Sequence, residues 1–219
     1  LTGHTIGATL LYKSAGIFRD TAQINKTPHV SGAIPGDVII KDQNGDGVIN
    51  ADDRILFDKT ADPEITFGLS LNFRYKSFEL SALINGAGTA WVRMLGSQQG
   101  AAGDYYQFSA DGRWTPDNID ATKPRAYDGS STYWRGKFAT DLEYQNQSYA
   151  RLKNIQLSYY VPLQNLNVKF INSAQIYLSG ENLFLIYSSK DRIWDPEFSG
   201  TRDNYLIMKV LSVGARISF

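Results

Sequence analysis

The sequence lacks cysteine entirely and has only two histidines and two methionines in 219 residues. Without cysteine, the chain can form neither disulfide bonds nor thiolate metal sites. It also has no apolar run of roughly 18 residues, which excludes a membrane-spanning helix. Its 22 basic and 22 acidic side chains cancel, so the charge gives no reason to expect nucleic acid or an anionic lipid surface as a partner.

Aromatic residues and glycine are abundant instead. Aromatics make up 13% of the residues, with 13 tyrosines, and 19 residues are glycine. This composition is typical of an all-β protein with many turns. The chain begins at Leu1 without an initiator methionine or a signal peptide, so we expect it to be a piece of a longer protein.

The stretch Ile65–Ile84 carries the clearest secondary-structure signal. Between Ile65 and Tyr75 every odd position is apolar and every even position is small or polar, and the alternation resumes at Phe78 on the other parity. A period of two over this length predicts two antiparallel strands joined by a tight turn at Lys76-Ser77. Strands of about 10 residues suit a tilted transmembrane strand, although a hairpin in a soluble sandwich fits the same pattern.

Three later segments, 155–161, 174–186 and 207–219, alternate in the same way, and we expect the first of these strands to begin at Tyr149. Leu152 has the wrong parity for the first of them, which predicts a β-bulge near Lys153-Asn154. The last segment ends on the aromatic Phe219, as outer-membrane barrels often do. We therefore predict an all-β fold: an antiparallel up-and-down transmembrane β-barrel segment of about five strands with long extracellular loops.

The connections between these strands differ in length. If the C-terminus is periplasmic, the turns at 76–77 and 162–172 are periplasmic, and the long segments 85–148 and 187–205 lie outside. Short turns on the inner side and long loops on the outer side are the arrangement expected of such barrels. This difference in connection length was not used to assign the strands, so it is partly independent support for a barrel.

The long connection after the hairpin is rich in aromatic residues, namely Trp91, Tyr105, Tyr106, Phe108, Trp114, Tyr127, Tyr133 and Trp134. A connection of this length would be unusual inside a compact soluble domain. Its aromatic rings have two interpretations: they stack on the sugar rings of a cargo, or they pack the loop against itself.

The sharpest local motif is the acidic loop Asp42–Asp53. Its first six positions match the calcium-loop pattern D-x-[DN]-x-[DN]-G. The predicted ligands are the side chains and one backbone carbonyl that this pattern directs at the ion, from Asp42, Asn44, Asp46, Val48 and Asp53. Such oxygen ligands favour Ca²⁺ in a structural role, and the alternative is an Asx- and Gly-rich turn without an ion. The loop lies in residues 1–64, which we interpret as an extracellular loop region, followed by the barrel strands and their loops in 65–219.

The first residues are weakly patterned. Asp20 followed by Gln23 predicts the capped start of a short helix, which Thr27-Pro28 would end. Both histidines, His4 and His29, also lie here, and no Ser/His/Asp constellation or phosphate-binding glycine loop occurs in the sequence. We therefore predict that the chain is not an enzyme.

Several short motifs, in this order and spacing, resemble the C-terminal part of SusC/RagA-type TonB-dependent outer-membrane transporters. They are Gly16-Ile17-Phe18, Pro35-Gly36-Asp37, Asp42–Arg54, Tyr75–Leu80, Arg113-Trp114-Thr115-Pro116, Tyr149–Ile155, Ser179–Phe184, Asp195-Pro196-Glu197 and Phe219. The resemblance covers nearly the whole chain.

This resemblance implies a large barrel in the outer membrane of a Gram-negative cell, with an N-terminal plug, a TonB contact and a SusD-like surface lipoprotein as a lid. Such transporters import oligosaccharides or peptides with energy from the inner membrane. Five strands cannot close a barrel of that size, so we expect the plug, the TonB contact and the other strands outside this chain. The alternative is a soluble, calcium-stabilised carbohydrate-binding β-sandwich, which would bury the apolar faces of its strands between two sheets.

Overall fold

The computed structural model describes residues 2–93, 107–126, 138–163, 170–189, 195–197 and 207–219. Its elements, in chain order, are β1 (Thr9–Tyr12), β2 (Ser14–Ile17), α1 (Thr21–Ile24), β3 (Val38–Ile40), the 3₁₀ turn η1 (Ala51–Asp53), β4 (Arg54–Phe57), β5 (Ile65–Tyr75), β6 (Phe78–Gly88), β7 (Trp91–Arg93), α2 (Gln107–Ala110), η2 (Asp141–Glu143), β8 (Tyr144–Asn146), β9 (Tyr149–Tyr160), β10 (Ser173–Ser188) and β11 (Val210–Ser218). They form two compact units, one of Leu1–Thr60 with Val92–Gln145 and one of Ala61–Trp91 with Asn146–Phe219.

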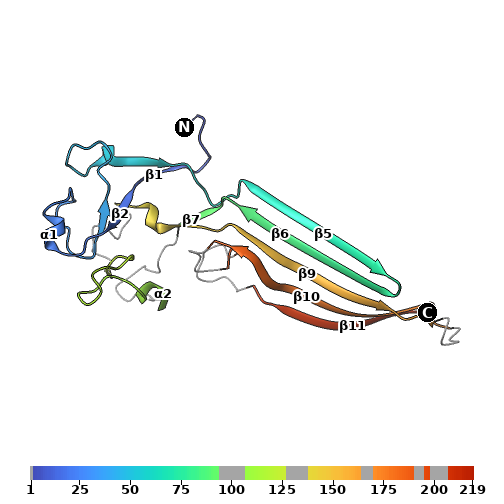
Figure 1. The fold of residues 1–219 in the computed structure, drawn as a ribbon. Helices are drawn as coiled ribbons and strands as arrows, with labels where there is room; N and C mark the ends of the chain where they lie inside the picture. The colour runs from blue at the N-terminus through green and yellow to red at the C-terminus, as the bar shows by residue number, and fades with distance from the viewer. Residues whose placement is uncertain (1, 94–106, 127–137, 164–169, 190–194, 198–206) are drawn as a thin grey trace. The chain divides into compact units, whose positions relative to one another are not determined.

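The second unit is a single antiparallel sheet of five long strands in the order β11-β10-β9-β6-β5, which lie side by side in Figure 1. The predicted hairpin is confirmed: β5 has the predicted bounds, and Tyr75 pairs with Phe78 across the turn. The other long strands also form where alternation predicted them. The expectation of an all-β fold with about five antiparallel strands is therefore confirmed.

The predicted bulge in β9 is also confirmed. Against β6, the pairing passes from Leu152 opposite Ile84 directly to Asn154 opposite Leu83, so Lys153 is an extra residue in β9. Against β10, the pairing jumps from Glu181 to Phe184 at the same level. Such a bulge re-aims the side chains on one side of it relative to the other.

The register divides the sheet into an apolar face and a polar face. Because β5 and β6 pair without interruption, side chains two residues apart share a face along both strands. The apolar face carries mainly Phe67, Leu69, Leu71, Phe73, Leu80, Ile84, Ile155, Leu157, Ile176, Leu178, Leu211, Val213 and Ile217.

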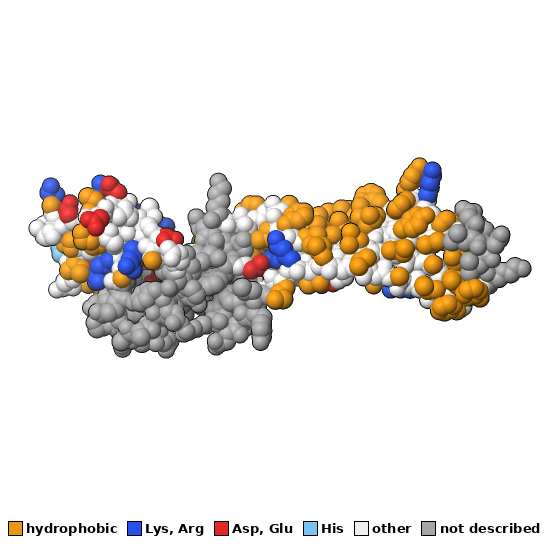
Figure 2. Space-filling view, turned by 90° about the horizontal axis from the view of Figure 1, so that it is seen from below, with side chains coloured by type: hydrophobic (Ala, Val, Ile, Leu, Met, Phe, Trp, Pro, Cys, Tyr) orange, Lys and Arg blue, Asp and Glu red, His pale blue; other side chains and the backbone are white. Residues whose placement is uncertain are grey.

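This apolar face is open. Leu178 is 55% exposed and Val213 is 78% exposed. Figure 2 shows hydrophobic side chains gathered over the part of the molecule that the long strands form, with few charged side chains among them. Since a sandwich would bury these side chains under a second sheet, the exposed face is evidence against the sandwich alternative.

The first unit has a small core of its own. Phe18, Ile24 and Ile39 are buried against one another, and Ala33 packs on them. Phe18 directly follows β2, Ile24 belongs to α1 and Ile39 to β3. Strand β2 pairs with β3, and β1 pairs with β4. The predicted helix start is confirmed, because an Asp20 Oδ1 atom accepts a hydrogen bond from the Gln23 N–H at 2.8 Å.

Residues from the long connection after the hairpin complete this first unit. Arg125 donates from Nε to the buried carboxylate of Asp37 at 2.7 Å. Lys13 donates to Asp141 at 2.5 Å, and the Tyr12 N–H donates to the Ala139 carbonyl at 2.9 Å. Part of the connection thus folds with the N-terminal residues, a boundary that differs from our division into 1–64 and 65–219. No helix in the described ranges is both long and apolar enough to cross a membrane.

Candidate functional site

The polar face of the five-stranded sheet has a chemistry distinct from that of the opposite face. It presents mostly hydroxyl and amide groups, with charged side chains near its two ends. Its members are Thr66, Ser70, Asn72, Arg74, Glu79, Ser81, Asn85, Asn154, Gln156, Ser158, Gln175, Ser179, Glu181, Ser212, Arg216 and Ser218. A hollow on this face is lined by Ser70, Asn72, Ser81, Asn154, Gln156 and Ser179, among others. Groups of this kind offer hydrogen bonds to a neutral polar cargo.

One charged cluster lies at the end of this face remote from the Lys76-Ser77 turn. Arg151, whose side chain is 4% exposed, donates from Nη2 to both carboxylate oxygens of Asp195, at 2.6 and 2.5 Å. Lys153 donates to Glu197 Oε2 at 2.8 Å. Tyr149 and Asn85 donate to Glu197 Oε1 at 3.0 and 3.3 Å. Two cations therefore balance two anions inside a largely buried network.

The surroundings of Glu197 favour its charged form. Burial by itself raises the pKa of the Glu197 carboxyl, but hydrogen bonds from Lys153, Tyr149 and Asn85 outweigh burial and hold that pKa below its usual range. The carboxylate therefore stays ionised at neutral pH, and both ion pairs are formed.

A second charged cluster lies near the turn between β5 and β6. The Tyr160 hydroxyl donates to Glu79 Oε2 at 3.0 Å, and the Arg74 guanidinium lies 5.1 Å from the centre of the Tyr160 ring. Arg74 and Glu79 are register partners on adjacent strands. The sequence alternation placed these side chains on the polar face, and the register confirms that position.

The predicted calcium loop is held together by its own polar groups. Asp42 accepts the N–H groups of Gly45 and Gly47 at 2.7 and 2.8 Å, and Asp46 accepts that of Val48 at 2.8 Å. Asn44 Nδ2 donates to Asp46 Oδ2 at 2.9 Å. These side chains are exposed and lie in one loop.

Asp53 differs from the other predicted ligands because it is fully buried. Its two carboxylate oxygens accept the N–H groups of Gln43 and Asn50, both at 2.8 Å, so it caps the η1 turn. The Asn50 hydrogen bond lowers the Asp53 pKa most, burial raises it, and the net shift is downward. Within the described ranges, no group of three or more Asp, Glu or His side chains is arranged to hold an ion. Any ion here would need the Asn44 side chain and the Val48 carbonyl.

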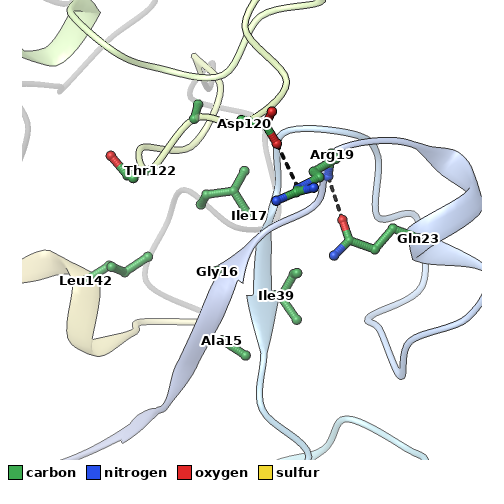
Figure 3. Close-up of a pocket in the computed structure, with 10 residues that line it drawn as sticks. Ala15, Gly16, Ile17, Arg19, Gln23, Ile39, Asp120, Thr122 and Leu142 are labelled. Atoms are coloured by element: carbon green, nitrogen blue, oxygen red, sulfur yellow. Dashed lines mark hydrogen bonds and ion pairs between the residues drawn. The ribbon is translucent and has the colours of Figure 1, made fainter.

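The first unit also has a pocket of about 350 Å³. In Figure 3 the Arg19 side chain points to Asp120, with 3.1 Å between Nε and Oδ1, while aliphatic side chains from Ile17, Ile39 and Leu142 line the rest. Among the described residues that line the pocket, Arg19 and Asp120 are the titratable ones, and both are largely exposed. This lining has no nucleophile beside a base, so it gives no indication of catalysis.

One of the aromatic residues in the long connection has a packing role. Trp114 donates from Nε1 to the Arg19 carbonyl at 3.2 Å and packs against Gly36. Trp114 thus supports the interpretation that these aromatics pack the connection rather than bind sugar. Side chains outside the described residues are those of Tyr105, Tyr106, Phe108, Tyr127, Tyr133 and Trp134.

Comparison with curated proteins gives a consistent result. The chain is 27% identical over 203 residues to TonB-dependent receptor P26 of Formosa agariphila, and 29% identical over 211 residues to TonB-dependent receptor P3 of the same organism. The chain is similar to TonB-dependent receptors. These matches cover 91% and 92% of the chain, which spans a fifth of the length of each relative. No family model matches.

Solved structures show where this fold has been seen before. The RagAB peptide transporter matches with a TM-score of 0.64 at 24% identity, covering 97% of this chain and 23% of that one. The RagAB peptide importer in its 'closed-closed' state matches with a TM-score of 0.63 at 25% identity, covering 97% and 23%. The resemblance to SusC/RagA-type TonB-dependent receptors is confirmed, and none of these relatives is named as an enzyme.

Sequence reasoning missed the cluster around Arg151. The Asp195-Pro196-Glu197 motif was part of the resemblance to TonB-dependent receptors, but its partners were not recognised. A signal was present, because the bulge predicted near Lys153-Asn154 lies beside two cationic side chains, Arg151 and Lys153.

Proposed function

We propose that this chain forms part of the wall of an integral outer-membrane importer in a Gram-negative cell. The observation that carries this proposal is the exposed apolar face of the long-stranded sheet, opposite a polar face with paired charges. A sheet with these two faces suits a position between hydrocarbon and an aqueous channel. The similarity to TonB-dependent receptors supports the same role.

The cargo we propose is an oligosaccharide or a peptide. A polar face lined by hydroxyl and amide groups suits both, since each cargo is rich in neutral hydrogen-bonding groups. The RagAB matches are named as a peptide transporter and a peptide importer, which supports the peptide alternative. The partners we propose are a SusD-like surface lipoprotein and the TonB complex, the latter reached through a part of the protein outside this chain.

Uptake by cells tests this proposal. The full-length protein would be produced together with a SusD-like lipoprotein from the same genome in a host with an inducible tonB gene, and labelled oligosaccharide and peptide mixtures would be offered. We expect uptake that needs the full-length protein and stops when TonB is depleted. Uptake that continues without TonB, or none from either mixture, would contradict the proposal.

We also propose that the Asp42–Asp53 loop binds Ca²⁺ as a structural ion. Each carboxylate oxygen that accepts one N–H keeps a second lone pair, so Asp42 and Asp46 can ligate an ion without losing their backbone partners. Calorimetry tests this proposal by comparing the protein with its Asp42→Asn variant. We expect heat of Ca²⁺ binding at millimolar concentration or below that the variant loses; equal heats would contradict the site.

A further inference from the structure

The bulge in β9 changes which face of the sheet the cationic side chains of the sequence Arg151–Ile155 lie on. Strict alternation would place Arg151 and Lys153 on the same face as Ile155 and Leu157, which is the apolar face. The extra residue at Lys153 shifts the parity, so Arg151 on its N-terminal side lies on the face opposite to that of Ile155, and Lys153 donates to Glu197 on that same side. Arg151 then pairs with Asn85, which shares the polar face with Ser81.

This arrangement has a conformational cost. The ladder is interrupted on both sides of Lys153, and Asn182 of β10 adopts a left-handed backbone with φ of 52° at the same level. Arg151 is also removed from water, which is unfavourable for a guanidinium unless its partners are well placed. Distortions of this kind persist where the surrounding structure requires them, and they gather at functional sites.

The contacts that result all converge on three residues of the last long connection, Asp195–Glu197. Arg151 binds Asp195, while Lys153, Tyr149 and Asn85 bind the two oxygens of Glu197. The Glu197 N–H also donates to Asp195 Oδ1 at 3.1 Å, which ties the two acidic residues to each other. Since the strand partners lie on the polar face, Asp195–Glu197 lies over that face.

We propose that Arg151 and Lys153 are positioning residues that hold Asp195–Glu197 over the polar face, where this segment restricts passage along the face. This inference rests on the proposed importer function. Asp195–Glu197 narrows the path of cargo along the polar face at the level of Asn85, on the outer side of the hydroxyl- and amide-lined hollow. Cargo that follows the polar face must pass Asp195–Glu197 before it reaches Ser70 or Asn72.

The absence of cysteine from the chain allows a direct test with a thiol reporter. Ser70→Cys places a thiol in the hollow, two positions along β5 from Gly68, the register partner of Asn85. The full-length protein, with any cysteine elsewhere replaced, would be labelled in intact cells by a membrane-impermeant maleimide carrying a polymer chain. The labelling rate then measures access along the polar face from outside.

We expect Arg151→Gln to raise this labelling rate about tenfold or more, because a charge-assisted pair is lost from a buried site. Arg216→Gln removes an arginine from the same face at the far end of β11 and is the matched control, with no expected change. The charge-exchanged pair Arg151→Asp with Asp195→Arg should return the rate toward the original value, which a merely structural role would not predict.

Three outcomes would overturn the inference: an unchanged rate in Arg151→Gln, an equal rise in Arg216→Gln, or no recovery in the charge-exchanged pair. If Arg151→Gln fails to reach the membrane, Asp195→Asn and Glu197→Gln remove the same pairs from the loop side and leave β9 intact. Labelling needs no cargo, so a failed uptake experiment would contradict the importer function without deciding this inference.

Discussion

Substituting one residue on each face of β10 by arginine would distinguish a sheet that faces a membrane from a soluble sheet. Leu178 and Ser179 are neighbours on β10, and their side chains lie on the apolar and the polar face respectively. We predict that Leu178→Arg destabilises the folded protein in a bilayer far more than Ser179→Arg does. In a soluble sheet with both faces wet, the two substitutions would cost similar amounts.

The magnitude follows from the position of Leu178 along its strand. β10 begins at Ser173, so Leu178 lies about 17 Å along a strand that rises about 3.3 Å per residue. With a tilt of about 40°, this corresponds to about 13 Å of height, near the middle of an apolar band about 25 Å tall. An arginine at that depth costs about 2–4 kcal/mol, which lowers the ratio of folded to unfolded protein about 30- to 900-fold.

Urea unfolding of the full-length protein in lipid vesicles measures this difference. The Ser179→Arg variant is the control, since Ser179 lines the polar hollow and an arginine there reaches water. We expect Leu178→Arg to lose about 3 kcal/mol and Ser179→Arg less than about 1 kcal/mol. Equal losses, or a larger loss in Ser179→Arg, would refute our assignment of the two faces.

Two further predictions concern the first unit. Gly36→Ala should destabilise this unit by about 2–4 kcal/mol, because Gly36 has a φ of +88° and an added Cβ would lie 2.6 Å from Trp114 Cε3. Gly45 also has a left-handed backbone but lies in open space, so Gly45→Ala should cost only about 1 kcal/mol. The rate of limited proteolysis measures the difference in stability between the two variants. The lowered pKa of Asp53 means that its hydrogen bond from the Asn50 N–H stabilises the loop above the ordinary pKa of about 3.9, and this stabilisation is lost as the pH falls below that value. Hydrogen exchange, corrected for intrinsic pH effects, should therefore show that the backbone amides of the loop stay protected at pH 5. Loss of that protection at pH 5 would contradict the prediction.

The long strands could be predicted because their signal is local. Alternation and the Lys76-Ser77 turn fix the bounds of β5, and the misplaced parity of Leu152 reveals the bulge. The end of β6 was less visible, since Gly86 and Gly88 continue the strand without apolar side chains to mark a face. Where a strand is extended only by its pairing with a neighbouring strand, its own sequence carries no alternating pattern that would reveal it.

The contacts that complete each unit could not be predicted because their partners are far apart in sequence. Arg125 meets Asp37 across 88 residues, and Arg151 meets Asp195 across 44. Single charged residues in loops occur throughout the chain, and nothing in their spacing selects these pairs. The calcium-loop pattern did not indicate that Asp53 is buried and that its carboxylate caps the η1 turn.

The orientation of the sheet is tested most directly by spin labels on neighbouring residues of β11. Val213 lies on the apolar face and is 78% exposed, while Ser212 lies on the polar face. With a nitroxide on a cysteine at each position in turn, in the full-length protein in lipid vesicles, relaxation by dissolved oxygen and by a water-soluble nickel chelate reports hydrocarbon and water. We predict that oxygen dominates at residue 213 and the nickel chelate at residue 212. Dominance of the nickel chelate at both positions, or the reverse order, would contradict the placement of this sheet between lipid and channel.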